Sequence, residues 1–230
     1  MIARRTLLQS LALAGAAGLL PYSRAALAQS GDQGLIDQSR VAVDNFTRDT
    51  NFTDMRRHLA NARGVFVVPQ LIKGSFIIGG EGGSGVLLAR NSGQWSQPAI
   101  YTMGAGSIGL QIGGEVSEVM LLLMSARAVD AILRNEFKLG ADASVAAGPV
   151  GAGIEASTTT NLGADILSYA RTKGLAVGFS VEGAVITARH GRNETYYGRS
   201  VHPRDILYNN AVANNGTGEL RQALQQAELR

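Results

Sequence analysis

The sequence predicts an α+β domain whose helices flank a glycine-rich core, either a strongly bent antiparallel sheet or a barrel-like arrangement of strands. Gly accounts for 29 of the 230 residues, about twice its usual share. Between residues 65 and 198, short apolar runs alternate with glycine turns, a pattern typical of strands. Glycines weaken straight strands, so their abundance favours strands that bend sharply or pack closely together.

Residues 1–28 have the pattern of an export signal. Arg4 and Arg5 precede the apolar run 7–20, and residues 26–28 (ALA) match an A-x-A cleavage site. The arginine pair and the mildly apolar run resemble twin-arginine (Tat) signals. A membrane anchor is the alternative, but the run is shorter than the roughly 20 residues that span a bilayer. We therefore expect a periplasmic protein processed after Ala28, free or peripherally bound to a membrane.

The charge and cysteine content exclude several classes of partner and site. The net charge is +3, and loss of residues 1–28 would remove three arginines and no acid, which leaves zero. Nucleic acid is therefore not expected as a partner, and any attraction to an anionic membrane must come from a local patch. The absence of Cys rules out disulfides, zinc-thiolate and iron–sulfur sites, thiol nucleophiles and lipoprotein acylation.

Two helices are expected at the start of the processed chain. Apolar residues over 35–46 recur with a period near 3.6, which predicts an amphipathic helix. A shorter helix follows, with Asp54 as its expected N-cap and Gly64 as its end.

Strands dominate the next segment. A strand at 65–68 is expected to end at Pro69, and others follow at 75–78, 86–89, 100–103, 107–112 and 116–124. The run 119–124 does not alternate between apolar and polar residues, which predicts a central strand buried on both faces. Ser125 is the expected N-cap of the helix that comes next.

The last third of the chain is predicted as follows. Strands are expected at 145–147, 153–158 and 175–181, with a helix over 164–171. Residues 184–189 and 194–197 are expected to form a hairpin around a turn at 190–193. Residues 29–208 would then form one domain, followed by a polar tail, 209–230, with a helix over 219–229.

One stretch of sequence combines cations with an apolar edge. The cations are Arg56, Arg57, Arg63 and Lys73, and the neighbouring apolar candidates are Phe66, Leu71 and Phe76. This combination suits an anionic lipid headgroup and its acyl chains. Four charges contribute about 4 kcal/mol, or millimolar affinity, so some apolar burial is needed for tighter binding. The alternative is that the apolar residues are core strand and the cations a solvated surface.

Other chemical motifs are weak. The pattern G-x-G-x-x-G occurs at 80–85 and 104–109, but a strand pattern follows each, where a dinucleotide site needs a helix. Ser107 lies in a variant nucleophile elbow, a motif that requires a strand-to-helix turn. The three histidines are widely spaced, so no metal, cofactor or catalytic residue is expected. Candidates for shifted pKa values are the glutamates among Gly and apolar residues: Glu81, Glu115, Glu118, Glu155 and Glu182.

Seven ordered segments resemble the SYLF domain, which occurs in exported bacterial proteins and in eukaryotic membrane-trafficking proteins. They are LANARGV (59–65), GGEGGSGVL (79–87), GQWSQP (93–98), GLQIGGE (109–115), LGADASVAAGPVG (139–151), SYARTKGL (168–175) and YYG (196–198). The resemblance covers about residues 33–208. It implies a non-enzymatic lipid-binding module, because eukaryotic members bind phosphoinositides and some bind actin. Their basic N-terminal helix corresponds loosely to residues 35–46 together with 55–63.

Three functions therefore remain open. The first is a periplasmic protein that binds phospholipid or an anionic membrane surface. The second is a structural or interaction protein of the cell envelope, whose glycine-rich sheet binds a protein partner. The third is a hydrolase that uses Ser107.

Overall fold

The computed structural model describes residues 20–76, 78–108, 113–134, 136–151, 163–177 and 181–228. Most of the expected signal and the strand expected at 153–158 lie outside these ranges. The helices are α1 (Leu20–Arg48), η1 (Thr50–Phe52), α2 (Thr53–Asn61), α3 (Ala126–Ile132), α4 (His190–Tyr197), α5 (Pro203–Leu207), η3 (Asn215–Thr217) and α6 (Gly218–Glu228). The strands are β1 (Gly64–Phe76), β2 (Ile78–Asn91), β3 (Gln94–Trp95), β4 (Ala99–Ile108), β5 (Gly113–Leu123), β6 (Glu136–Lys138), β7 (Val145–Ala147), β8 (Ile166–Thr172), β9 (Leu175–Val177) and β10 (Val185–Ala188).

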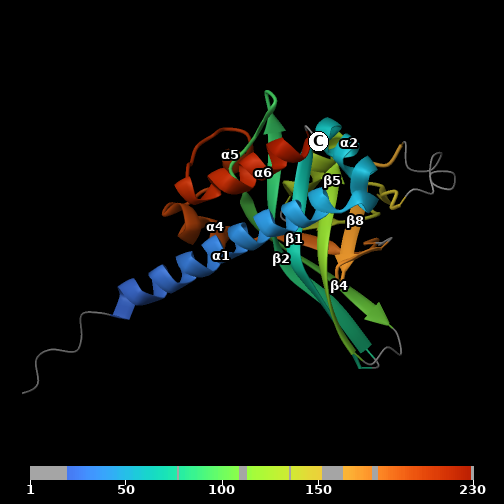
Figure 1. Cartoon of the computed structure of the whole chain (residues 1–230). Coiled ribbons are helices and arrows are strands. Elements are labelled where there is room, and N and C mark those ends of the chain that lie inside the picture. The colour runs from blue at the N-terminus through green and yellow to red at the C-terminus, as the bar shows by residue number, and fades with distance from the viewer. Residues whose placement is uncertain are drawn as a thin grey trace, which may run out of the picture.

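The strands form one curled sheet, a half-barrel, with helices packed on both of its faces (Figure 1). Their order is β6-β10-β4-β2-β1-β5-β8-β7, with β3 beside β2 and β9 beside β8. All pairings are antiparallel except that of β7 with β8. The predicted α+β class with a bent sheet is therefore confirmed, although the sheet is mixed and not purely antiparallel.

Each face of the sheet has its own apolar core. Val65 and Val67 of β1 pack with α1, α2 and α6, so we name their side the α1 face. Phe66 and Val68 point to the other side, where α3 and α5 pack, and we name this the α3 face. Alternation along β1 thus divides its side chains between two cores.

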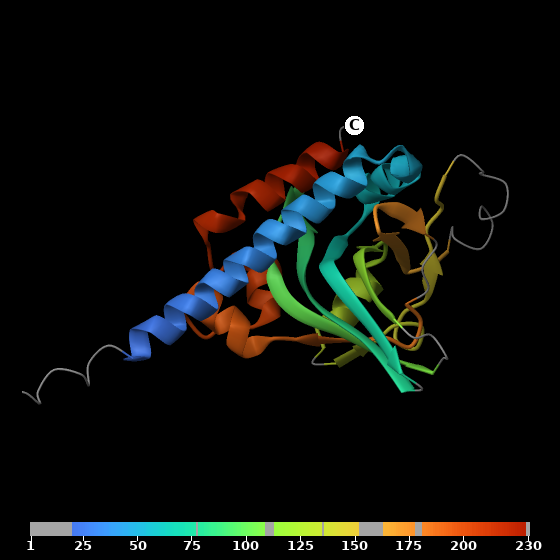
Figure 2. The same cartoon turned by 60° about the horizontal axis from the view of Figure 1, so that its bottom comes forward.

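The central strands are longer than we predicted from the sequence. β1 continues through Pro69, because its register with β2 and β5 shifts between Val67 and Ile72. Such a bulge accommodates a proline, which has no N–H for the ladder. The far ends of β1, β2, β4 and β5 project together from the body of the sheet (Figures 1 and 2). We name this projection the arm; it comprises residues 72–76, 78–82, 104–108 and 113–116.

Helix α1 crosses the sheet with α6 beside it (Figure 2). Leu35, Val43 and Phe46 of α1 are buried, as are Leu220 and Leu224 of α6, all in the core of the α1 face. The helices predicted over 35–46 and 219–229 are thus both present, and α1 is longer than predicted. The first turns of α1 extend beyond the sheet in both views.

Two predictions from the last third of the chain were wrong. Residues 164–171 were expected to be helical, but β8 occupies Ile166–Thr172. Five consecutive residues, 166–170, are buried, and periodicity alone does not separate such a run from a helix. The hairpin expected around 190–193 is instead helix α4, which ends at Gly198 with a φ of 69°. This left-handed C-terminal glycine is the local signal that the hairpin prediction overlooked.

Several local predictions were correct. Residues 119–123 of β5 are fully buried on both faces. The Ser125 hydroxyl accepts a hydrogen bond from the Ala128 N–H and caps α3. Asp54, by contrast, is not the cap of α2: the helix begins at Thr53, and Asp54 lies in its first turn.

Candidate functional site

The four predicted cations do not form one patch. Arg56 and Arg57 lie on α2, and Arg63 follows that helix. Arg63 lies near Tyr208. Burial raises the pKa of the Tyr208 hydroxyl, and the positive charge of Arg63 opposes that rise. Lys73 lies ten residues further along β1, on the order of 30 Å away at the rise of an extended strand.

Lys73 is surrounded by acids. The register places it between Glu81 on β2 and Glu115 on β5, on the α3 face of the arm. Burial raises the pKa of the Glu81 carboxyl, and the charge of Lys73 opposes that rise. The arm therefore carries more negative than positive charge on this face, and Lys73 is poorly placed to attract an anion alone.

The two cations of α2 have a third neighbour that the sequence analysis did not single out. Arg48, in the last turn of α1, has 74% of its side chain exposed, and its nearest carboxylate, that of Asp44, is 3.8 Å away. Arg57 is also 74% exposed and pairs with Asp54 at 2.8 Å. Arg56 donates to the Thr47 carbonyl at 2.8 Å, one residue before Arg48. We name Arg48, Arg56 and Arg57 the basic corner.

A polar groove of about 330 Å³ adjoins the basic corner, between α1 and α6. Arg40 and Arg48 line it from α1, and Gln222 and Gln226 line it from α6. Arg40 is engaged there, because it pairs with Asp44 at 2.9 Å and with Glu219 at 3.3 Å. Asp44 and Glu219 also line the groove, so the donors it offers to an anion are the exposed guanidinium of Arg48 and the side-chain amides of Gln222 and Gln226.

The predicted apolar contacts lie elsewhere. Phe66 is fully buried in the core of the α3 face, and Leu71 is 2% exposed. Neither side chain meets solvent in this structure, so contact with lipid through them would require the sheet to open. Phe76 is the last residue of β1, and its side chain is outside the part of the chain that the structure describes.

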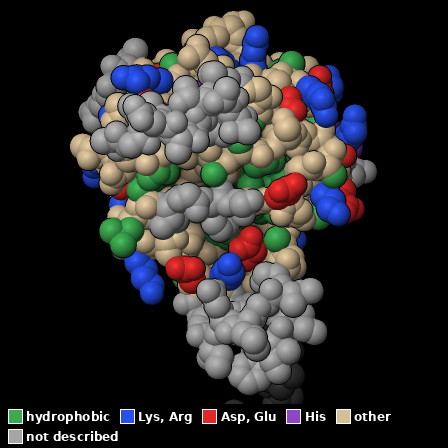
Figure 3. All heavy atoms as spheres, turned by 90° about the vertical axis from the view of Figure 1, so that its right-hand side faces the viewer, with side chains coloured by type: hydrophobic (Ala, Val, Ile, Leu, Met, Phe, Trp, Pro, Cys, Tyr) green, Lys and Arg blue, Asp and Glu red, His purple; other side chains and the backbone are tan. Residues whose placement is uncertain are grey.

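Other large apolar side chains are exposed. Ile72 and Val116 are directly opposite each other on β1 and β5, and are 56% and 52% exposed. Val41 of α1 and Leu175 of β9 are 45% and 70% exposed. Figure 3 shows hydrophobic side chains dispersed among charges of both signs on one face of the molecule. The view shows no continuous basic surface on that face.

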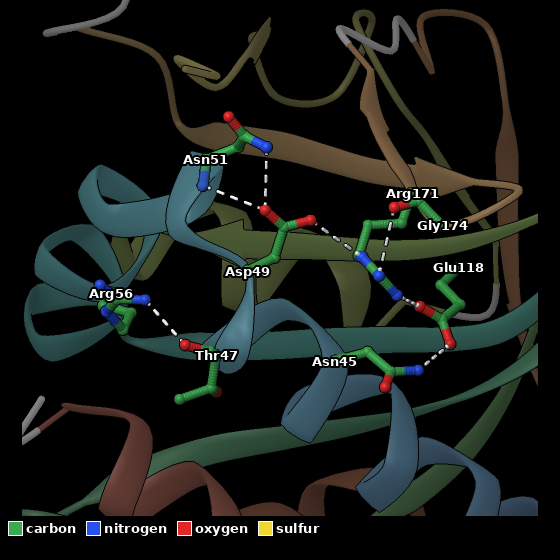
Figure 4. Close-up of polar contacts among 8 residues, drawn as sticks. All are labelled: Asn45, Thr47, Asp49, Asn51, Arg56, Glu118, Arg171 and Gly174. Carbon is green, nitrogen blue, oxygen red and sulfur yellow. Dashed lines mark hydrogen bonds and ion pairs between the residues drawn. The ribbon is translucent and has the colours of Figure 1, made fainter. Parts of the chain in front are cut away.

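Arg171 is the centre of a largely buried ion cluster (Figure 4). Its guanidinium donates to Glu118 of β5 at 2.8 Å and to Asp49, after α1, at 3.4 Å. The second Glu118 oxygen accepts from Asn45 of α1 at 2.6 Å. Because these groups bind one another, the cluster connects the end of α1 to β5 and β8 and stabilises the fold. Glu118, one of the acids singled out in the sequence, therefore has a structural role.

The weak chemical motifs of the sequence lie in strands. Ser107 lies within β4 opposite Gly79, not on the strand-to-helix turn that a nucleophile elbow needs. The first G-x-G-x-x-G lies inside β2, without the helix that binds a pyrophosphate. The His58 Nδ1 is 2.8 Å from the Tyr169 hydroxyl. In the ranges described, no three His, Asp or Glu side chains are grouped to hold a metal.

Comparison with known proteins identifies the family. A family model described as "Ysc84: Las17-binding protein actin regulator" matches residues 104–227, which is more than half of the chain. The chain belongs to the Ysc84, or SYLF-domain, family. The resemblance noted from the sequence is thereby confirmed, and the match extends into α6 as far as residue 227.

Similar SYLF-family proteins occur in animals and fungi. The rat "SH3 domain-containing YSC84-like protein 1" is 36% identical over 153 residues, which cover 65% of this chain and 44% of that protein. "Protein YSC84" of Saccharomyces cerevisiae is 34% identical over 155 residues, 65% of this chain and 32% of that protein. The "SH3 domain-containing protein PJ696.02" of Schizosaccharomyces pombe is 36% identical over 153 residues, with 65% and 35% covered. The chain thus spans less than half the length of each.

No helix in the described ranges has both the length and the apolar character that crossing a bilayer requires.

Proposed function

We propose that this chain is a non-enzymatic protein that binds phospholipid at an anionic membrane surface, with headgroups held at the basic corner. We further propose that it acts in the periplasm after export. The observation that carries the proposal is the exposure of Arg48 and Arg57, each about three-quarters exposed, beside an open polar groove. Arg90 and Arg192, by contrast, pair with acids that are at most 8% exposed.

The magnitudes suit a weak, reversible contact. Each cation near an anionic bilayer contributes about 1 kcal/mol, so the three arginines give about 3 kcal/mol, which corresponds to millimolar binding. Asp54 lies beside Arg57 at 2.8 Å and offsets part of this attraction. The corner alone therefore supports membrane binding that is sensitive to salt, and tighter binding needs an apolar contribution.

Flotation with vesicles tests the proposal. The exported protein, expected to begin at Gln29, is mixed with vesicles of phosphatidylethanolamine alone or with phosphatidylglycerol, at low and high salt. We expect binding only to the anionic vesicles, lost at high salt. The double variant Arg48→Ser/Arg57→Ser should bind roughly 30-fold more weakly, because two charges at about 1 kcal/mol each are removed.

A matched control removes the same charge elsewhere. Arg134 and Arg189 are exposed and lie near β6 and β10, away from the corner. Arg134→Ser/Arg189→Ser should retain most of the binding. An equal loss in both double variants would mean that net charge, and not the corner, governs binding. Absence of binding to any vesicle would refute the proposed function.

A second candidate is an envelope protein that binds another protein. The names of the relatives mention SH3 domains, and the family description mentions an actin regulator that binds Las17, so protein partners are compatible with this family. On this chain, a groove of about 270 Å³ between α1 and the β1 bulge is lined by Val41, Pro69 and Gln70, with Val41 half-exposed. A stoichiometric protein that co-purifies from periplasm without lipid would favour this candidate.

A further inference from the structure

The arm has two chemically different faces. On the α3 face, the register places Lys73 between Glu81 and Glu115. On the α1 face, one row across the four strands consists of Val116, Ile72, Gly82 and Gly104. The next row towards the tip contains Gly114, Gly74, Gly80 and Gly106. None of these eight positions carries a charged or polar side chain.

The glycines of this face are not explained by packing. A Cβ at Gly80, Gly82 or Gly104 would approach its nearest neighbour at 3.6–3.7 Å, and at Gly106 it would meet nothing within 4 Å. On the α3 face the situation is the opposite, because a Cβ at Gly85 would lie 2.5 Å from the Val67 carbonyl oxygen. The α1 face of the arm is therefore open above Gly80, Gly82, Gly104 and Gly106, and Ile72 and Val116 are exposed beside them.

The sequence remains apolar towards the tip. The register pairs Phe76 with Ile78 in β1 and β2, and Ile78 with Ile108 in β4. These are register positions only: Phe76, Ile78 and Ile108 are apolar by sequence. The exposed Ile72 and Val116, among uncharged glycines on a part of the sheet that projects from the body (Figure 1), suit a non-aqueous partner.

We propose that the α1 face of the arm enters the acyl-chain boundary of a bilayer, as the apolar part of the membrane contact; this inference rests on the proposed function. Two features favour lipid over a protein occupant. A stable protein partner covers about 800 Å² from some 20 residues, whereas this face offers two large exposed side chains among glycines. It also presents no charged side chain for a protein partner or a second copy to pair with, whereas acyl chains need none.

The edges of the arm limit how deeply it enters. In the described ranges, β10 accompanies β4 only as far as Gly104, and β8 accompanies β5 only from Ser117. Beyond these points no described strand pairs with the outer edges of β4 and β5, and the hydrocarbon core does not tolerate unpaired N–H and C=O groups. The arm therefore enters only the headgroup and upper acyl region, about 5–10 Å deep.

A single labelled cysteine tests the inference, because the chain has no Cys of its own. Val116→Cys is labelled with an environment-sensitive fluorophore in the exported protein. Leu175→Cys is the matched control: Leu175 pairs with Thr172 on β8, whose hydroxyl contacts that of Ser117, so it lies at a similar height on the α3 face. The membranes are vesicles of phosphatidylethanolamine and phosphatidylglycerol, with spin labels at the headgroup end or the methyl end of the acyl chain.

We expect the fluorophore at position 116 to shift to shorter wavelength and to be quenched more by the shallow spin label than by the deep one. The fluorophore at position 175 should not respond. Ile72→Ser and Val116→Ser should each weaken binding about five- to tenfold without changing its salt dependence, because each removes a half-exposed apolar side chain.

The outcomes separate this inference from the proposed function. If the protein floats with vesicles but the fluorophore at position 116 is silent, or if both fluorophores respond equally, the arm is not the inserted surface and the corner alone binds. If the Ser variants float as the parent does, the inference is again wrong. If the unmodified protein does not float, both the inference and the proposed function fail.

Discussion

Gly85→Ala is expected to destabilise the protein strongly, because this glycine is required by close packing. Its added Cβ would lie 2.5 Å from the Val67 carbonyl oxygen and 2.8 Å from Cε2 of the Phe66 ring. The first of these is backbone of the central strand, and the second belongs to a fully buried core residue. Neither atom moves without disturbing β1, so relief of the clash must come from the strand itself.

The expected loss is about 3 kcal/mol, at the upper end of typical overpacking costs. In a domain of this size it corresponds to a fall of about 6–12 °C in Tm. Gly104→Ala is the matched control: its nearest neighbour would be the Glu81 carbonyl oxygen at 3.7 Å. This variant should gain about 0.5–1 kcal/mol, because alanine loses less backbone entropy than glycine when the chain folds.

Urea denaturation followed by the emission of Trp95, the single tryptophan, measures both variants, and calorimetry gives Tm independently. A loss below about 1 kcal/mol for Gly85→Ala would show that β1 and β2 separate easily, contrary to the packing argument. A loss for Gly104→Ala comparable to that of Gly85→Ala would refute the conclusion that the α1 face of the arm is open, and with it the reasoning about the arm.

Three further predictions concern buried polar contacts. Arg171→Met leaves its two carboxylate partners without a cation and should cost roughly 3–5 kcal/mol in urea denaturation at neutral pH; a loss below about 1 kcal/mol would contradict a structural role. Burial lowers the pKa of His58, so its contribution to stability is complete above the unfolded value of about 6.5 and is lost as the pH falls below it. His58→Gln should flatten the pH dependence of Tm in that window, and an unchanged profile would contradict this. Glu228→Ala removes the carboxylate that accepts a hydrogen bond from the Trp95 indole N–H at 2.6 Å. The emission of Trp95 should therefore move to longer wavelength, and the free energy of unfolding should fall by about 2–3 kcal/mol. Unchanged emission would show that α6 stays in place without this carboxylate.

The parts of the fold that were predicted correctly have strong local signals. The uninterrupted apolar run of β5, the serine cap of α3 and the helical period of α6 each depend on neighbours in sequence. The elements that were predicted wrongly depend on contacts with distant parts of the chain. β8 is buried along five consecutive residues because strands lie on both sides of it and cores on both faces, and such a run does not reveal its period. β1 passes Pro69 only because neighbouring strands shift register there.

The candidate site was only partly visible in the sequence for a geometric reason. Residues 56–63 lie on a helix and just beyond it, where the chain rises about 1.5 Å per residue, but Lys73 is reached along a strand that rises about 3.3 Å per residue. Residues 56–73, which were interpreted in the sequence as one basic patch, therefore extend over much of the molecule. Arg48 was overlooked because the preceding helix carries as many acids as cations nearby, and only the return of α2 brings it close to Arg56.

The pairing of Arg171 with Glu118 and Asp49 had no sequence signal. Glu118 and Asp49 are 53 and 122 residues away from Arg171 along the chain, and they meet because the C-terminal end of α1 reaches β5 and β8. Glu118 stood out in the sequence as an acid among apolar residues, and its side chain is 22% exposed. Only the fold shows that the buried charge is paired and therefore structural.

The basic corner and the arm are compatible with one flat membrane. Both lie on the α1 side of the sheet, separated along β1 by on the order of 30 Å. Helix α1 raises the corner by about one helix diameter, roughly 10 Å, above the sheet. A planar membrane that touches both the corner and the arm is then inclined to β1, because it descends about 10 Å over about 30 Å. Shallow entry of the arm, about 5–10 Å, accommodates this slope, so electrostatic contact at one end and apolar contact at the other can occur together.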